Sequence, residues 1–158
     1  MVHRVRAAVR AEAAPMTFVP IRSRRRAKQL VSFEGIEFGE RLWPTDFDAL
    51  IEWRDKAWLV FEVKLWDKDV PYGQKLALER FVRDVRKAGK RAVAAVVQHH
   101  VEDPEVDVRL SDCEVREVFM SGEERWRPPK SPMTAQELAD GYIRFVEGSR
   151  RDWSVTDA

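Results

Sequence analysis

The chain has 158 residues, enough for one domain with a hydrophobic core of its own, and 28 Lys or Arg nearly balance 27 Asp or Glu. The single cysteine, Cys113, excludes an internal disulfide and favours a reducing compartment. No apolar run approaches the roughly 18 residues that cross a bilayer, so we expect a soluble, cytoplasmic protein without a membrane partner.

The N-terminal segment is strongly basic. Residues 1–28 hold eight Lys or Arg against Glu12 alone, and five of the eight gather near its end: Arg22, Arg24, Arg25, Arg26 and Lys28. Such clustering is the electrostatic footprint of a surface for polyanions such as nucleic acid, although a solvated tail explains it equally well. We expect residues 1–23 to form a basic arm and residues 24–148 to form the domain.

The first half of the domain predicts a helix and then a hairpin. Apolar periodicity over residues 24–34 indicates the helix, which ends at Gly35. Residues 47–53 and 57–66 are rich in aromatic and β-branched side chains, so the charged turn between them predicts two antiparallel strands.

A second helix is predicted over residues 73–88. Its buried stripe contains Leu78, Phe81, Val82 and Val85. On the solvent-facing side we expect charge pairs four residues apart, which include Lys75 with Glu79 and Glu79 with Arg83.

The second half predicts two further strands and a last helix. Residues 91–98 form a short apolar run, typical of a strand covered on both faces and parallel to the 57–66 strand. Residues 114–120 and 124–126 predict a hairpin. Thr134 and Glu137 form a capping box for a helix that ends at Gly148, and we expect residues 149–158 to be a flexible tail.

Charged residues lie inside the two apolar strands of the first hairpin. If the turn has three residues, Asp48 directly faces Glu62, and Lys64 shares that face because side chains alternate with period two. A two-residue turn would instead put Asp48 and Glu62 on opposite faces. The predicted site therefore depends on the length of this turn.

Two adjacent carboxylates repel unless one is protonated or a cation lies between them. Asp48, Glu62 and the backbone carbonyl of Val63 offer the hard oxygen ligands that suit Mg²⁺ or Mn²⁺. Such an ion activates water toward a phosphoryl group, and Lys64 would lie beside that water. The pattern favours phosphodiester hydrolysis, while a structural ion network on a half-exposed sheet face explains the spacing about equally well.

The stretch WPTDFDALIEWRDKAWLVFEVK resembles the active-site motif of the PD-(D/E)XK nuclease superfamily, with Asp48 as the first acidic ligand and Glu62-Val63-Lys64 as the ExK part. Together with PYGQKLALE at residues 71–79, it is similar to small phage-encoded members of that superfamily. The resemblance covers roughly residues 24–100 and implies an α/β fold with a mixed, α+β-like sheet and a restriction-endonuclease-like αβββαβ core. The C-terminal β-hairpin and helix are predicted from the sequence pattern alone. The resemblance also implies Mg²⁺ (or Mn²⁺) as cofactor, DNA as partner, attack by Mg-bound water on the phosphate, and residence in the host cytoplasm.

Two residues beside the motif receive supporting roles. The family's Pro-Asp pair is here Pro-Thr-Asp-Phe-Asp, so Asp46 competes with Asp48 for the first ligand position. Opposition to Glu62 favours Asp48 and leaves Asp46 to a second metal or a supporting contact. Gln74 lies on the sheet-facing stripe of the second helix and resembles the family's auxiliary glutamine, which reaches the active site or the phosphate.

Aromatic side chains stand near the same end of the predicted sheet. His99 and His100 end the parallel strand, where an imidazole could contact the phosphate, and we assign His99 to DNA contact together with the basic cluster. Trp53 and Trp58, near the hairpin turn, could stack on unpaired bases, and Trp66 flanks the site, although core packing is the commoner role of tryptophan.

These observations predict an Mg²⁺-dependent deoxyribonuclease whose catalytic residues are Asp48, Glu62, Lys64 and Gln74. The alternative is a nuclease-fold protein that binds nucleic acid or a protein partner without catalysis, and a structural protein is a third interpretation. The sequence leaves a homodimer open.

Overall fold

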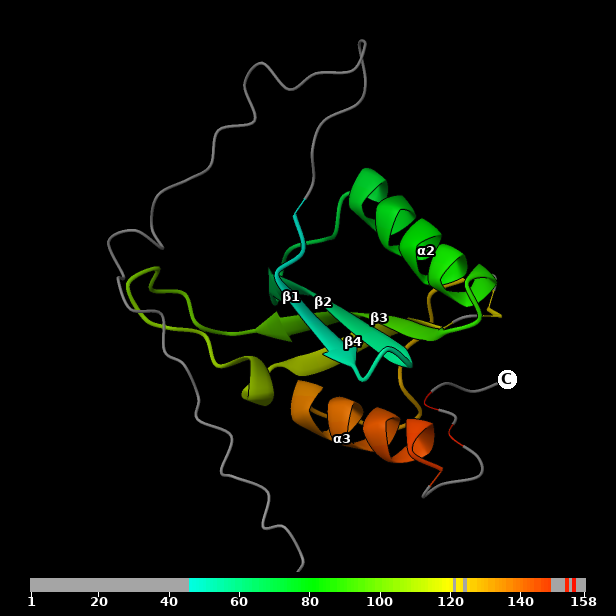
Figure 1. Cartoon of the computed structure of the whole chain (residues 1–158). Helices are drawn as coiled ribbons and strands as arrows, with labels where there is room; N and C mark the ends of the chain where they lie inside the picture. Colours follow the sequence, from blue (N-terminus) through cyan, green and yellow to red (C-terminus); the bar gives the residue numbers. More distant parts are fainter. Residues whose placement is uncertain (1–45, 121, 124, 149–152, 154, 156–158) are drawn as a thin grey trace, which may run out of the picture. The chain divides into compact units, whose positions relative to one another are not determined.

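The computed structural model describes residues 46–120, 122–123, 125–148, 153 and 155, all within one compact unit. The predicted helix over residues 24–34 and the basic cluster of residues 22–28 lie outside this part of the chain. The described unit is a sheet with one helix on each face (Figure 1). No helix in it is long and apolar enough to cross a membrane.

The sheet has four strands that lie side by side in sequence order: β1 (Ala49–Trp53), β2 (Ala57–Leu65), β3 (Arg91–His99) and β4 (Glu114–Met120). β1 and β2 are antiparallel, β2 and β3 are parallel, and β3 and β4 are antiparallel. The helix α2 (Tyr72–Lys87) connects the parallel pair. The predicted mixed α/β sheet and the parallel pairing of β2 with β3 are confirmed.

The turn between β1 and β2 has three residues. Trp53 pairs with Ala57, and Lys56 donates its N–H to the Trp53 carbonyl at 2.9 Å. Arg54 and Asp55 adopt φ angles of 48° and 58°, in the left-handed region that Asp tolerates better than most residues. This turn fixes the register of the hairpin and confirms the length on which the predicted site depends.

Two apolar layers hold the helices to the sheet. On one face, Leu59 and Phe61 pack with Leu138 of α3 (Ala135–Val146), and on the other Val60 packs with Leu78 and Val82 of α2. Because both faces of β3 are covered, all six residues from Ala92 to Val97 are buried, which explains the continuous apolar run.

The C-terminal hairpin is only partly as predicted. β4 forms, but residues 124–126 form no strand among the described positions; the return arm bonds β4 through one bridge between Val118 and Arg127. Pro128 and Pro129 follow directly, and neither has the N–H that would extend the ladder. A β-bulge between Val96 and Val97 also interrupts the pairing of β3 with β4.

The start of α3 confirms the capping box. The Glu137 N–H donates to Thr134 Oγ1 at 3.2 Å, and the Thr134 N–H donates to Glu137 Oε2 at 2.8 Å. A short 3-10 helix, η2 (Leu110–Asp112), precedes β4. Within the expected tail, Val155 is buried and Trp153 packs on Tyr142 and Phe145, so these two positions belong to the fold.

Replacing Thr134 with alanine is expected to lower the free energy of unfolding by about 1 kcal/mol, because the Glu137 N–H loses the side-chain oxygen that caps it, while the backbone N–H at position 134 still donates to Glu137. Urea unfolding measures the change, and Ser131→Ala, an exposed substitution outside the cap, is the control. Equal stabilities for the two variants would show that the box contributes nothing.

Candidate functional site

The hairpin register brings Asp48 to the position beside Glu62. The ladder between β1 and β2 ends at the pair Ala49 and Phe61, and the next step of the register joins Asp48 to Glu62. Beyond that pair, Asp48 Oδ2 accepts a hydrogen bond from the Val63 N–H at 2.7 Å. A carboxylate therefore continues the contact between the two strands where the backbone ladder stops.

Glu62 is the one charged side chain that is buried among the described residues, with 2% of the residue exposed. It lies on the face of the sheet that α2 covers, since it alternates with Phe61, which packs on the α3 side. Lys64, two residues on, places Nζ 2.5 Å from Glu62 Oε1 and keeps 22% of its side chain exposed. The ion pair thus joins a buried anion to a cation at the surface.

Burial raises the pKa of Glu62 above its ordinary value of 4.5. The hydrogen bond from Lys64 opposes this shift, but the negative charges of Asp48 and Asp46 raise the pKa further. The contact with Lys64 therefore does not fully offset the burial of Glu62 and the negative charges near it. The site favours an added positive charge, whether a proton or a metal cation.

The backbone of β2 also faces Asp48. The N–H and C=O groups of a strand residue point toward the same neighbouring strand, so the Val63 carbonyl lies on the Asp48 side along with the Val63 N–H. β1 begins at Ala49, opposite Phe61, so no residue of β1 pairs with Val63. The predicted backbone ligand is thus on the correct side of the strand.

Gln74 lies in the first turn of α2 with its side chain half-buried. Its Oε1 atom is buried and has no hydrogen-bond partner among the described residues. A buried amide oxygen without a donor is costly to the fold, so it requires a water, a cation or a ligand group nearby. The predicted placement of Gln74 on the sheet-facing stripe is confirmed.

The described residues contain no group of three or more His, Cys, Asp or Glu side chains that could hold one metal ion. Any ion at this site would therefore take two carboxylates at most, with backbone or amide oxygens and water completing its coordination. Mg²⁺ binds proteins in this way, through one or two carboxylates and several retained waters. The donor set at Asp48, Glu62 and Val63 fits such an ion.

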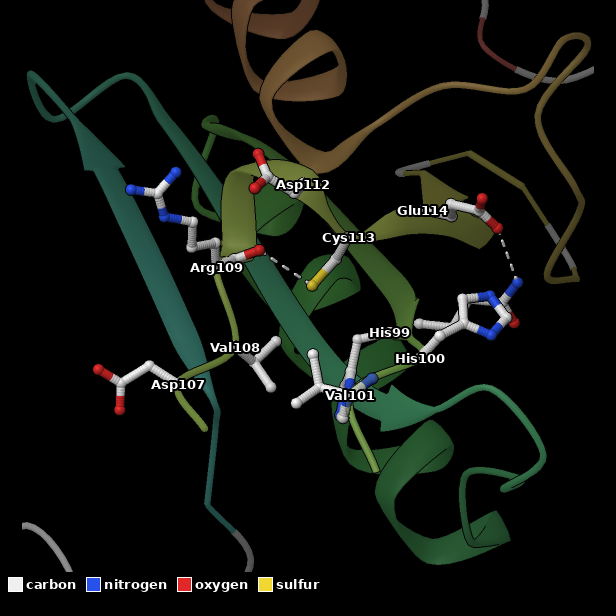
Figure 2. A pocket seen from close by; sticks show the side chains of 10 residues that line it. His99, His100, Val101, Asp107, Val108, Arg109, Asp112, Cys113 and Glu114 are labelled. Carbon is white, nitrogen blue, oxygen red and sulfur yellow. Dashed lines mark hydrogen bonds between the residues drawn. The ribbon is translucent and has the colours of Figure 1, made fainter. Parts of the chain in front are cut away.

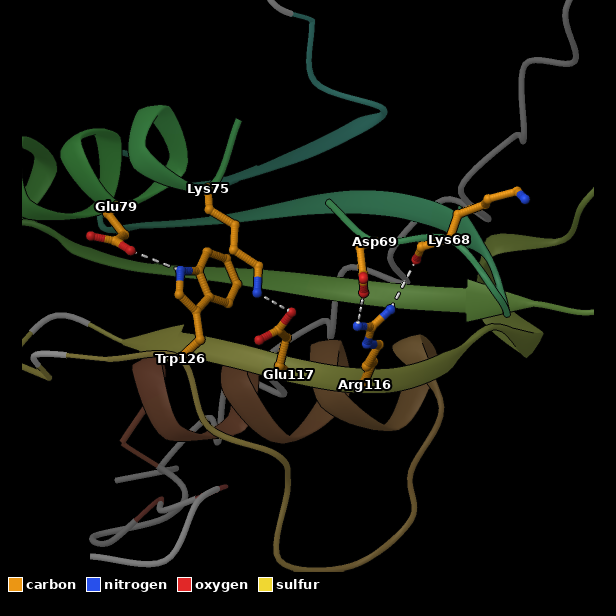
Figure 3. Close-up of polar contacts among 7 residues, drawn as sticks. All are labelled: Lys68, Asp69, Lys75, Glu79, Arg116, Glu117 and Trp126. Carbon is orange, nitrogen blue, oxygen red and sulfur yellow. Dashed lines mark hydrogen bonds and ion pairs between the residues drawn. The ribbon is translucent and has the colours of Figure 1, made fainter. Parts of the chain in front are cut away.

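A second carboxylate–lysine pair, which was not predicted from the sequence, lies on the same face of the sheet. Lys75 of α2 places Nζ 2.5 Å from Glu117 Oε1 of β4, and the Trp126 indole donates to Glu79 at 3.0 Å (Figure 3). The prediction that Lys75 and Glu79 face solvent is wrong, because β4 and the segment after it cover that side of α2. The predicted pair of Glu79 with Arg83 is confirmed at 3.3 Å.

Arg116 of β4 holds the connection between β2 and α2 in place. Its guanidinium donates to the Lys68 carbonyl at 2.9 Å and forms an ion pair with Asp69 (Figure 3). Arg116 also lowers the pKa of Asp69 below its usual value. The connection that leaves the Lys64 end of β2 is therefore fixed from two strands away.

The structure does not bring His99 to the carboxylates. His99 pairs with Leu65 while Glu62 pairs with Val96, and side chains alternate, so His99 lies on the opposite face of the sheet from Glu62. Its Nδ1 accepts from the Val101 N–H at 3.2 Å, and it lines a cavity of about 280 Å³ with Cys113 (Figure 2). Burial raises the pKa of the Cys113 thiol, consistent with a packing role.

His100 instead lies next to Trp66. The two rings are stacked, with centroids 5.9 Å apart and planes 20° apart. The basic cluster assigned to DNA contact lies outside the described residues, so that assignment stays a prediction.

Comparisons with protein families, with curated proteins and with solved structures find no match to this chain. The function is therefore inferred from the side chains that the fold brings together.

Proposed function

We propose that the protein is a divalent-cation-dependent deoxyribonuclease that hydrolyses phosphodiester bonds. The observation that carries the proposal is a buried carboxylate, Glu62, with a raised pKa, beside a second carboxylate, Asp48, and a lysine at 2.5 Å. Apolar residues at these positions would stabilise the sheet better than a charged cluster that lacks its cation. The same arrangement is what the PD-(D/E)XK resemblance implies.

Asp48, Glu62 and the Val63 carbonyl would hold Mg²⁺ or Mn²⁺. Asp46 is close enough to raise the Glu62 pKa, so it is the first candidate for a supporting contact or for a ligand of a second ion. When bound, the cation supplies Lewis-acid activation of water and of the phosphate, with charge stabilisation in the transition state.

The chain's own residues then position the reactants. The hydrogen bond from Lys64 favours the ionised form of Glu62 and opposes the effect of burial, and the lysine ammonium has further N–H donors for the attacking water or a phosphate oxygen. The Val63 N–H fixes the orientation of Asp48. The unpartnered Gln74 Oε1 would accept a hydrogen bond from a water that approaches from the α2 side.

A protein that binds nucleic acid without cleaving it is the second candidate. This candidate is favoured because both carboxylates already have partners within the protein: Asp48 accepts a hydrogen bond from the Val63 N–H, and Glu62 is paired with Lys64. In that case the cluster is structural, and DNA binding would not depend on a divalent cation at Asp48.

Cleavage assays on supercoiled, linear, single-stranded and branched DNA test the proposal. We expect product with Mg²⁺ or Mn²⁺, none in EDTA, and none with Lys64→Ala at equal protein concentration. Glu117→Gln alters a carboxylate on the same face outside the proposed site, and we expect it to cleave within a few-fold of wild type. No cleavage of any substrate by the wild type, or full activity of Lys64→Ala, would overturn the proposal.

A further inference from the structure

Trp66 differs from the other described tryptophans in its surroundings. Trp53 and Trp153 pack on the α3-side core, and Trp58 and Trp126 pack on the α2-side core. Trp66 packs on neither core, and 51% of it is exposed. Its one described ring contact is the stack on His100, which is also exposed. Core packing, the commonest role of tryptophan, therefore does not explain this residue.

The Trp66–His100 pair lies at the end of the proposed site. Trp66 donates its N–H to the His99 carbonyl at 2.9 Å, so the parallel pairing of β2 and β3 continues one residue past β2. Alternation then puts Glu62, Lys64 and Trp66 on one face of the sheet. Two residues of strand separate the Lys64 and Trp66 backbones by about 6.6 Å. A nucleotide with its phosphate at Lys64 can therefore reach the Trp66 ring with its base.

The segment that carries Trp66 is held firmly. The Lys68 N–H donates to the Leu65 carbonyl at 2.9 Å, Arg116 binds the Lys68 carbonyl, and Val70 is buried. A ring presented on a fixed segment loses little conformational entropy when a ligand stacks on it. The exposed pair is thus preorganised for a flat ligand.

The charges around the pair favour a neutral group. Asp67 is paired with Lys68 at 3.0 Å and Asp69 with Arg116, so the charges that follow Trp66 offset one another. The segment therefore has no excess positive charge to attract a phosphate, whereas stacking of an uncharged base needs none. In a duplex the faces of the bases are already stacked on one another, but a single strand leaves them free.

We propose that Trp66 and His100 form a stacking platform for an unpaired base, and that the DNA bound at the site is single-stranded. The inference rests on the proposed function for the position of the phosphate. Stacking is tolerant of sequence because every base has an aromatic face. The platform would therefore select single-stranded over duplex DNA and would not select a particular base.

Binding measurements in the Glu62→Gln background, in which cleavage is removed, test the platform separately from catalysis. We would measure the fluorescence anisotropy of a labelled short oligothymidylate, its duplex with oligoadenylate, and a strand of equal length that lacks bases. We expect tightest binding to the single strand and about tenfold or greater weakening in Trp66→Leu. Trp66→Phe, which keeps a ring, should bind within a few-fold of the parent, and the abasic strand should be insensitive to both changes.

Either of two results would overturn the platform: binding of the single strand that Trp66→Leu leaves unchanged, or equal weakening for the abasic strand. Absence of single-strand binding in the Glu62→Gln parent would overturn it as well. If Trp66-dependent binding is found but the wild type cleaves no DNA, the platform stands and the proposed nuclease function fails. If cleavage is found without Trp66-dependent binding, the platform fails and the proposed nuclease function stands.

Discussion

Glu62→Gln is expected to remove cleavage while it makes the protein more stable. Glutamine keeps the shape of the side chain but lacks the charge that a divalent cation requires, so we expect the rate to fall about 10³-fold or more. The same change removes a buried carboxyl group whose ionisation is unfavourable in the folded state. We expect the free energy of unfolding without added cation to rise by about 0.5–2 kcal/mol, as is common when a functional group is replaced.

The gain in stability has a defined pH dependence. Burial raises the Glu62 pKa in the folded state above the ordinary value of 4.5, so the folded state binds this proton more tightly than the unfolded state. Ionisation of Glu62 therefore costs stability at neutral pH, and this cost disappears as the pH falls below 4.5. Urea unfolding of both proteins over this range should show a difference that is largest near neutrality and vanishes in acid. A difference that is constant with pH would contradict the account.

Lys64→Met is expected to have the largest effect on stability. It leaves Glu62 buried without the ammonium at 2.5 Å, and breaking one partner of a buried pair costs about 3–5 kcal/mol. Because Lys64 is 22% exposed, we expect the lower end of that range, about 3 kcal/mol. Urea unfolding at neutral pH measures it.

The double variant Glu62→Gln/Lys64→Met separates the lost pair from lost packing. Once Glu62 is neutral, removal of the lysine charge should cost less than about 1 kcal/mol, and the cycle should give a coupling free energy of about 2 kcal/mol. Equal costs of Lys64→Met in both backgrounds would show that the contact contributes nothing to the fold. Lys64→Met and the double variant should both be inactive in cleavage.

The hairpin was predictable because its turn and its register are specified by residues that are close together in the sequence. Three charged residues between two apolar runs specify the turn, Asp55 tolerates the left-handed backbone, and period-two alternation then places Asp48, Glu62 and Lys64. The stripe of α2 and the capping box of α3 follow from local spacing in the same way.

The contacts of β4 were not predictable, because they depend on non-local pairing. The bulge in the pairing with β3 leaves Val115 and Val118 on the same face although their spacing is odd, and it turns Glu117 toward α2. The odd spacing of the two valines is the signal that could have indicated the bulge. His99 was misplaced because position at a strand end was considered without the alternation of faces.

The central claim is that Asp48 and Glu62 together hold a divalent cation. Calorimetric titration with Mn²⁺ in the absence of DNA tests it most directly. Asp48→Asn separates the charge from the strand contact. The asparagine oxygen can still accept a hydrogen bond from the Val63 N–H, while the negative charge is removed. The account predicts saturable Mn²⁺ binding by the wild type and by Glu117→Gln, and its loss in Asp48→Asn and in Glu62→Gln. No binding by the wild type, or binding that both site variants retain, would contradict it.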